Sequence, residues 1–165
     1  MNVSPEIAIA GGGIGGLSLA LMLHEAGIKV RIYESVNELA EIGVGINILP
    51  HATKEFARLG ILDRLSAAGV HTERYCWFNR FGQEIFCEAR GRVAGYDWPQ
   101  ISIHRGTFHR ILVDAVRERL GPQSILLNHH LAEFDQQNDR VQLHFIDKAT
   151  GRTQTKTSAD MLIAA

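Results

Sequence analysis

Residues 7–34 read IAIAGGGIGGLSLALMLHEAGIKVRIYE, and this stretch decides the fold class. It opens with the apolar run 7–10, which is typical of a buried strand. Over 14–26 apolar residues recur at helical spacing, and Gly27 then provides a helix stop. A second apolar run at 30–33 predicts another strand. This order of strand, glycine turn, helix and strand predicts a βαβ unit, whose parallel strands need a helical crossover.

The turn between the first strand and the helix carries the pattern Gly11-x-Gly13-x-x-Gly16. Gly11 allows a tight turn out of the strand, Gly13 lets a pyrophosphate approach the backbone, and Gly16 lets helix and strand pack closely. The first helical turn, with Ile14 and Gly15, offers unpaired N–H groups and a partial positive charge. The pattern therefore predicts a binding site for the phosphates of a dinucleotide.

Glu34 stands at the end of the second strand, 18 residues beyond Gly16. A carboxylate at this place accepts hydrogen bonds from the ribose hydroxyls of an adenosine. It would also repel a 2′-phosphate, which argues against NADP at this site. FAD and NAD both present ADP to such a fingerprint, so the pattern by itself fits either cofactor.

The rest of the chain predicts further helices mixed with antiparallel strands, so the fold class is α/β. Helices are expected over 50–59, 63–68 and 108–120, and the last has a clear apolar stripe. Hairpins are expected over 73–88 and 131–146, and short strands over 101–103, 125–127 and 161–164. Residues 43–48 are expected to form a glycine-punctuated loop. The prediction is a Rossmann-like βαβ layer with inserted antiparallel strands.

Four segments together resemble the class A flavoprotein aromatic hydroxylases, the family of p-hydroxybenzoate and salicylate hydroxylases. They are the fingerprint 11–34, GVGINI at 43–48, SIHRG at 102–106 and the closing run 159–165. GVGINI, SIHRG and AVRERLG at 115–121 look closest to phenazine hydroxylases and their relatives. The resemblance implies that the cofactor is FAD rather than NAD, bound by a layer of the glutathione-reductase type.

The resemblance also implies roles for single residues. The cofactor-binding residues it implies are Gly11, Gly13, Ile14, Gly15, Gly16, Glu34, Gly45 and Arg105. Gly45 would lie along the isoalloxazine ring, and the Arg105 guanidinium would reach the ribityl or pyrophosphate region. For Asn47, a flavin contact and ordinary turn chemistry are equally good interpretations. No general acid or base is nominated, because the family's chemistry resides in the cofactor.

By resemblance the activity is hydroxylation of a small aromatic substrate with NAD(P)H and O₂, and the segments closest to phenazine hydroxylases imply a phenazine-like substrate. The alternatives are another FAD-dependent oxidase or reductase and a non-catalytic nucleotide-binding module. In the family, the closing run leads into an Asp-Gly motif, which would follow Ala165. We therefore expect residues 1–165 to be the N-terminal part of an FAD-binding domain, with 73–100 beginning the substrate-domain sheet.

Composition narrows the remaining function classes. The formal net charge of −1 predicts no nucleic-acid partner, and no apolar run is long enough to predict a membrane span. No histidine spacing matches a zinc site, so no metal is expected. Cys76 and Cys87 are expected to be small buried hydrophobes in a reducing, cytoplasmic setting. The oligomeric state stays open.

Overall fold

The computed structural model describes residues 6–39, 43–148 and 150–165. The chain divides into two compact units. The first unit contains Met1–Ala40 and Leu112–Ala165, and the second contains Glu41–Ile111. The division falls inside the long helix α4 (Arg105–Leu120), so this helix contributes residues to both units.

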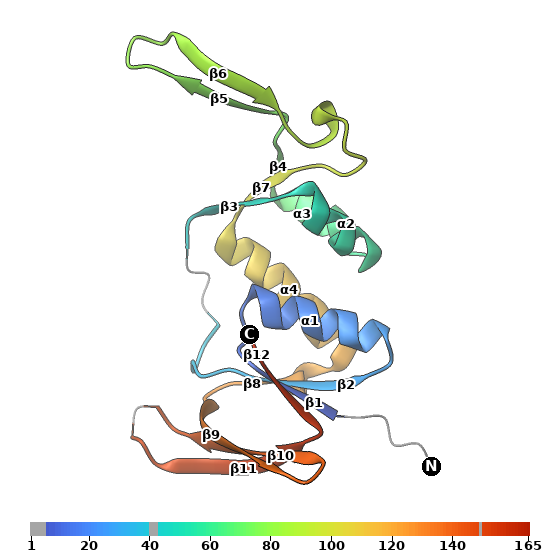
Figure 1. Ribbon diagram of the computed structural model, residues 1–165, viewed down its shortest axis with the longest axis vertical. Coiled ribbons are helices and arrows are strands. Elements are labelled where there is room, and N and C mark those ends of the chain that lie inside the picture. Colours follow the sequence, from blue (N-terminus) through green and yellow to red (C-terminus); the bar gives the residue numbers. More distant parts are fainter. Residues whose placement is uncertain (1–5, 40–42, 149) are drawn as a thin grey trace. The chain divides into compact units, whose positions relative to one another are not determined.

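The first unit is built on a four-stranded parallel sheet with the order β12-β1-β2-β8. Its strands are β1 (Glu6–Ala10), β2 (Lys29–Tyr33), β8 (Ile125–Leu126) and β12 (Met161–Ala164). Helix α1 (Ile14–Glu25) joins β1 to β2, and Gly27 follows it with φ +73° (Figure 1). The predicted βαβ unit and the α/β class are therefore confirmed.

Helix α1 and an antiparallel meander cover opposite faces of this sheet. Ile9 and Ile32 share the face on which α1 packs. Ala8 and Tyr33 point to the other face, where they meet Phe145 and its neighbours from the meander. The meander strands are β9 (His130–Gln137), β10 (Arg140–Ile146) and β11 (Thr153–Ala159). These three layers, visible in Figure 1, are the glutathione-reductase-type arrangement that the resemblance implied.

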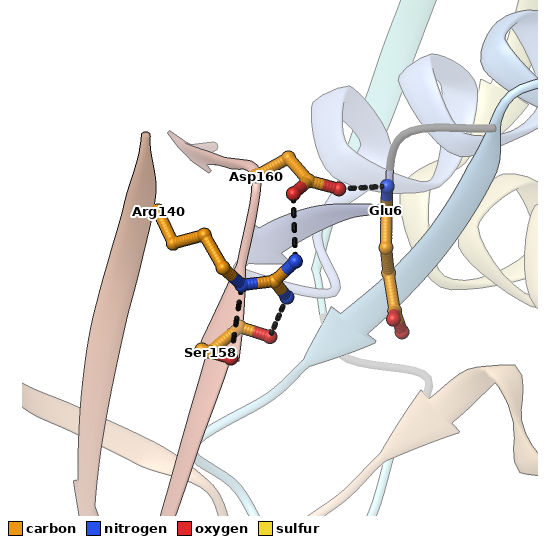
Figure 2. A network of polar contacts seen from close by, with 4 residues as sticks. All are labelled: Glu6, Arg140, Ser158 and Asp160. Carbon is orange, nitrogen blue, oxygen red and sulfur yellow. Dashed lines mark hydrogen bonds and ion pairs between the residues drawn. The ribbon is translucent and has the colours of Figure 1, made fainter. Parts of the chain in front are cut away.

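A polar network ties the meander to the edge of the parallel sheet (Figure 2). Asp160 lies between β11 and β12, and its carboxylate accepts hydrogen bonds from the Glu6 N–H at 2.7 Å and from Arg140 Nη1 at 2.8 Å. The Arg140 guanidinium also donates to the carbonyl and hydroxyl oxygens of Ser158. One carboxylate thus joins β1, β10 and the β11–β12 turn.

The second unit contains a three-stranded antiparallel sheet with the order β3-β7-β4. These strands are β3 (Gly45–Ile48), β4 (Val70–His71) and β7 (Ile101–His104), and helices α2 (Pro50–Arg58) and α3 (Leu62–Ala68) lie between β3 and β4 in the chain. The expectation of a loop over 43–48 is wrong for residues 45–48. Backbone pairing with β7, a distant segment, makes this glycine-containing run a strand.

A separate hairpin completes the second unit. It consists of β5 (Arg74–Phe78) and β6 (Glu84–Ala89), as the sequence predicted. Short 3₁₀ helices follow at Gly91–Ala94 and, in the first unit, at Pro122–Ser124. No helix among the described residues is long and apolar enough to cross a membrane.

The expectation that the two cysteines are small buried hydrophobes is wrong. Cys76 and Cys87 are only half-buried, and they are joined by a disulfide across the β5–β6 hairpin. The strand register sets Cys76 directly opposite Cys87, so the two side chains share one face of the hairpin. Their spacing along the chain did not reveal this pairing, because it depends on the register and not on a recognisable cysteine motif.

Candidate functional site

The glycine turn after β1 is held by backbone contacts that leave no room for a side chain at Gly11 or Gly16. The Gly11 N–H donates to the Tyr33 carbonyl at 2.8 Å, and the φ of Gly11 is +122°. A Cβ on Gly11 would collide with the Ala165 carbonyl, and one on Gly16 would collide with the Gly11 carbonyl. The Cβ on Gly16 would also lie 3.2 Å from Ile9 Cγ2. Gly11 therefore makes the turn, and Gly16 brings α1 against β1.

The other glycines of the turn leave its outer side open. A Cβ on Gly13 or Gly15 would meet nothing within 4 Å, and both residues are exposed. Gly13 is the N-cap of α1, whose first turn has neither a side-chain cap nor an acidic residue. The first N–H groups of a helix have no partner inside it, and Ile14 is among these donors. The turn thus fits a phosphate group that approaches the backbone.

The Glu34 carboxylate reaches back to this turn from the end of β2. Its Oε2 accepts the Gly12 N–H at 2.6 Å, and its Oε1 accepts the Val36 N–H and the Ser35 hydroxyl, both at 3.0 Å. Burial acts to raise the pKa of Glu34, but the hydrogen bonds from Val36, Gly12 and Ser35 outweigh it and lower the pKa. Glu34 is therefore an ionised acceptor at neutral pH.

The Glu34 carboxylate already accepts several local hydrogen bonds. Its Oε2 accepts the Gly12 N–H, its Oε1 accepts the Val36 N–H and the Ser35 hydroxyl, and the Ser35 backbone also hydrogen-bonds the carboxylate. A ribose hydroxyl that binds here would share Oε2 with the Gly12 N–H or replace the Ser35 hydroxyl on Oε1. Gly12, Ser35 and Val36 were missed in the sequence analysis, although they adjoin the fingerprint residues.

Neighbouring elements fix the backbone of Glu34. Its N–H donates to the Leu126 carbonyl at 2.8 Å, and its carbonyl accepts the His129 N–H at 2.8 Å. The preceding Tyr33 ring stacks on Phe145 with 4.5 Å between ring centroids. The meander core and the end of β8 together hold the carboxylate in its orientation toward the glycine turn.

In the second unit, two of the segments that carry the family resemblance become neighbours. Strand β3 pairs with β7, so that Gly45 lies opposite His104. The Arg105 N–H donates to the Val44 carbonyl at 3.0 Å. A Cβ on Gly43 would lie 3.1 Å from Arg105 Cβ, so this glycine makes room for the arginine stem. Arg105 is the first residue of α4 rather than a residue before it, and it is exposed.

Asn47 belongs to a chain of side-chain hydrogen bonds on one face of this sheet. Its Oδ1 accepts the Ser102 hydroxyl at 2.5 Å, and Ser102 Oγ lies 2.5 Å from Thr72 Oγ1. Because the Ser102 proton is directed to Asn47, the Thr72 hydroxyl donates to Ser102. The side-chain oxygen of Asn47 is thus hydrogen-bonded to the neighbouring strand β7 rather than to a local turn.

Comparison with known proteins identifies this arrangement. A family described as FAD binding domain matches residues 4–165. The chain belongs to this family. The FAD-binding domain is similar to phenazine 1,6-dicarboxylic acid hydroxylase of Lysobacter antibioticus, with 36% identity over 97% of this chain and 40% of the relative. It is also similar to 6-hydroxynicotinate 3-monooxygenase of Bordetella bronchiseptica, with 32% identity over 97% of this chain and 42% of the relative.

Solved structures agree with the family assignment. HpxO of Klebsiella pneumoniae, complexed with FAD and uric acid, matches 98% of this chain with a TM-score of 0.81 and 26% identity, and the match covers 39% of that protein. The fold also matches p-nitrophenol 4-monooxygenase of Pseudomonas putida, with a TM-score of 0.85 over the whole of this chain. FAD is therefore the cofactor of this domain. The chain spans about two fifths of the length of the curated relatives it matches.

Proposed function

We propose that this FAD-binding domain serves a monooxygenase that hydroxylates a small aromatic ring with NAD(P)H and O₂. The observation that carries the proposal is the convergence of the glycine turn and Glu34, joined by the 2.6 Å hydrogen bond from the Gly12 N–H. This geometry suits the ADP half of FAD. The names of the relatives, which include hydroxylases and monooxygenases of aromatic compounds, support the reaction class.

The proposed roles of the residues follow from their chemistry. The open side of the turn at Gly13, Ile14 and Gly15 receives the pyrophosphate, while Gly11 and Gly16 give the turn its shape. Glu34 orients the adenosine ribose by accepting its hydroxyl protons. When bound, FAD supplies the redox chemistry for oxygen insertion. The protein contributes binding, orientation and exclusion of water.

For the second unit, we propose that Gly45 lies beside the flavin ring and that Arg105 neutralises anionic oxygens of the cofactor. The pairing of β3 with β7 supports a shared role, because it joins their segments through backbone hydrogen bonds. The segment 73–100 would begin the sheet of a substrate domain, and its free-standing β5–β6 hairpin suits such a role. A cytoplasmic location is part of the proposal, since reduced nicotinamides are available there.

The substrate we propose is an aromatic acid. The names of three relatives specify a phenazine dicarboxylic acid, a hydroxynicotinate and a hydroxybenzoate, each of which combines an aromatic ring with a carboxylate. A phenazine-like acid is the first compound to test, because that relative shares 36% identity with this chain.

FAD binding by the protein tests the cofactor site. Glu34→Ala should weaken FAD and ADP affinity by at least about tenfold, because an ionised acceptor for the ribose is lost. The measurement is quenching of flavin fluorescence, with calorimetry for ADP. Glu38→Ala removes an exposed carboxylate from the loop after β2 and is the matched control. Equal affinities for the Glu34 variant and the wild type would refute the ribose assignment.

Product analysis tests the reaction class. It should use the longest form of the protein that its host produces, supplied with FAD, NADH or NADPH, O₂ and a panel of aromatic acids. Ring-hydroxylated product formed in step with nicotinamide oxidation is the expected result. Formation of hydrogen peroxide alone, with every acid tested, would favour an FAD-dependent oxidase or reductase instead.

A further inference from the structure

The β5–β6 hairpin carries a second group of chemically active side chains, in the unit that does not contain the glycine turn. Cys76 and Cys87 face each other across the strands, and the Glu84 carboxylate lies near both sulfur atoms. One ligand atom from each of the three residues lies within 4.8 Å of the others. Among the residues that the structure describes, no other such group of His, Cys, Asp or Glu side chains is found.

An irregularity in the strand pairing explains why Glu84 belongs to this group. Cys76 pairs with Cys87 and Trp77 with Phe86, but Phe78 then pairs with Glu84. The extra residue in β6 is Ile85, so the register shifts by one position. With regular pairing, Ile85 would share the cysteine face and Glu84 would lie on the opposite one. The bulge therefore turns a carboxylate toward the two sulfur atoms, as bulges near functional sites do.

We propose that, when the disulfide is reduced, Cys76, Cys87 and Glu84 bind a thiophilic divalent cation such as Zn²⁺. Two thiolates and one carboxylate are a ligand set that Zn²⁺ accepts, and a water molecule completes four-coordination. In a tetrahedral site with Zn–S bonds of about 2.3 Å, two sulfur ligands lie about 3.8 Å apart. Opposed cysteines on paired strands reach this separation through side-chain rotation alone.

The oxidised and metal-bound states of the hairpin exclude each other. A reductant of the thiol or phosphine class supplies two electrons, which open the Cys76–Cys87 bond, and two protons from the reductant or water complete two thiols. The cation then replaces the two thiol protons, which pass to water, so affinity rises with pH. The half-buried sulfurs and the exposed Glu84 leave the group accessible to both the reductant and the cation. This site does not depend on the proposed cofactor contacts, because none of its residues belongs to the cofactor site.

Titration of the phosphine-reduced protein with Cd²⁺ in the absence of oxygen tests the proposal. Cd²⁺ binds the same ligands as Zn²⁺ and gives an ultraviolet thiolate charge-transfer band. We expect this band to saturate at one Cd²⁺ per chain, and Zn²⁺ to abolish it by displacement. The oxidised wild-type protein, which keeps its fold and its carboxylates, should give no band. Absence of the band in the reduced protein, or equal binding by the oxidised protein, would overturn the site.

Variants test each ligand. Cys76→Ser and Cys87→Ser should each weaken Cd²⁺ binding by roughly 100-fold or more. Loss of a group that only hydrogen-bonds a metal ligand lowers metal affinity by about 10- to 100-fold, and loss of a ligand itself should cost more. Glu84→Gln should weaken it by about tenfold. Glu88→Gln is the matched control, because Glu88 lies on the same strand but pairs with Tyr75 on the other face. Unchanged affinity in the Glu84 variant would refute the three-ligand site.

Discussion

The glycine turn in the first unit and the cysteine pair in the second unit present their functional groups in different ways. The turn uses backbone N–H groups of consecutive residues. Close backbone packing around Gly11 and Gly16, which leaves no room for a Cβ at either residue, fixes the positions of these groups. The hairpin uses side chains from two strands, whose meeting depends on register and on one bulge. The turn is therefore preorganised in one state, whereas the hairpin group has two states set by its oxidation.

The largest effect on stability is expected from a substitution that disrupts the glycine turn. Gly11→Ala should lower the free energy of unfolding by roughly 2–5 kcal/mol, because a positive φ and a collision with the Ala165 carbonyl both oppose a side chain. Urea unfolding followed by circular dichroism measures this change. Gly13→Ala is the control: its Cβ meets open space, so stability should change little while FAD affinity falls. Equal destabilisation by both variants would contradict the assigned roles.

Reduction of the Cys76–Cys87 disulfide should have the next largest effect. The bond spans 11 residues, and the chain-entropy model gives a loss of roughly 2–3 kcal/mol in stability for a loop of that length. ADP affinity should not change, because its proposed contacts lie in the first unit. Urea unfolding and ADP calorimetry, with and without reductant, measure the two quantities. A fall in ADP affinity on reduction would show that the two regions are coupled.

The polar network around Asp160 (Figure 2) stabilises the parallel sheet that carries the glycine turn. Its loss should have a smaller effect on stability. Asp160→Asn should cost about 1 kcal/mol, because it removes the ion pair with Arg140, a contact weakened by its partial exposure. Asp139→Asn, in the exposed β9–β10 turn, is the matched control and should be neutral. Chemical denaturation of both variants gives the comparison. A neutral Asp160 variant would mean that backbone pairing and the hydrophobic core fix β12 beside β1 without this ion pair.

The smallest expected effect is the pH dependence contributed by Glu34. Its pKa is lowered in the folded protein, so its stabilisation is present above its ordinary pKa and is lost as the pH falls through the folded value. Glu34→Gln should flatten the stability profile in that acid range. Unfolding midpoints measured from neutral to acid pH test the sign. A profile unchanged by the substitution would mean that the hydrogen bonds to Glu34 add no net stability.

Local patterns predicted the strand, turn and helix that carry the proposed cofactor site. Gly11, Gly16 and Glu34 could be proposed as site residues because the βαβ unit places them at defined offsets along one continuous stretch. The strand at 45–48 could not, since its hydrogen-bond partner lies more than 50 residues away in β7. Glycine-containing runs favour loops locally, and only pairing with a distant segment overrides that preference.

The sequence by itself determined the α/β class, the position of the glycine turn and the family, because each can be recognised from short continuous segments of the chain. Tertiary structure decided which contacts form between segments that are distant in the chain. It joined Gly12 to Glu34, Asn47 to Ser102 and Cys76 to Cys87. These contacts follow from strand register and packing, which no short-range spacing encodes. The physical reason is that a shift of one residue in pairing moves a side chain to the opposite face of a sheet.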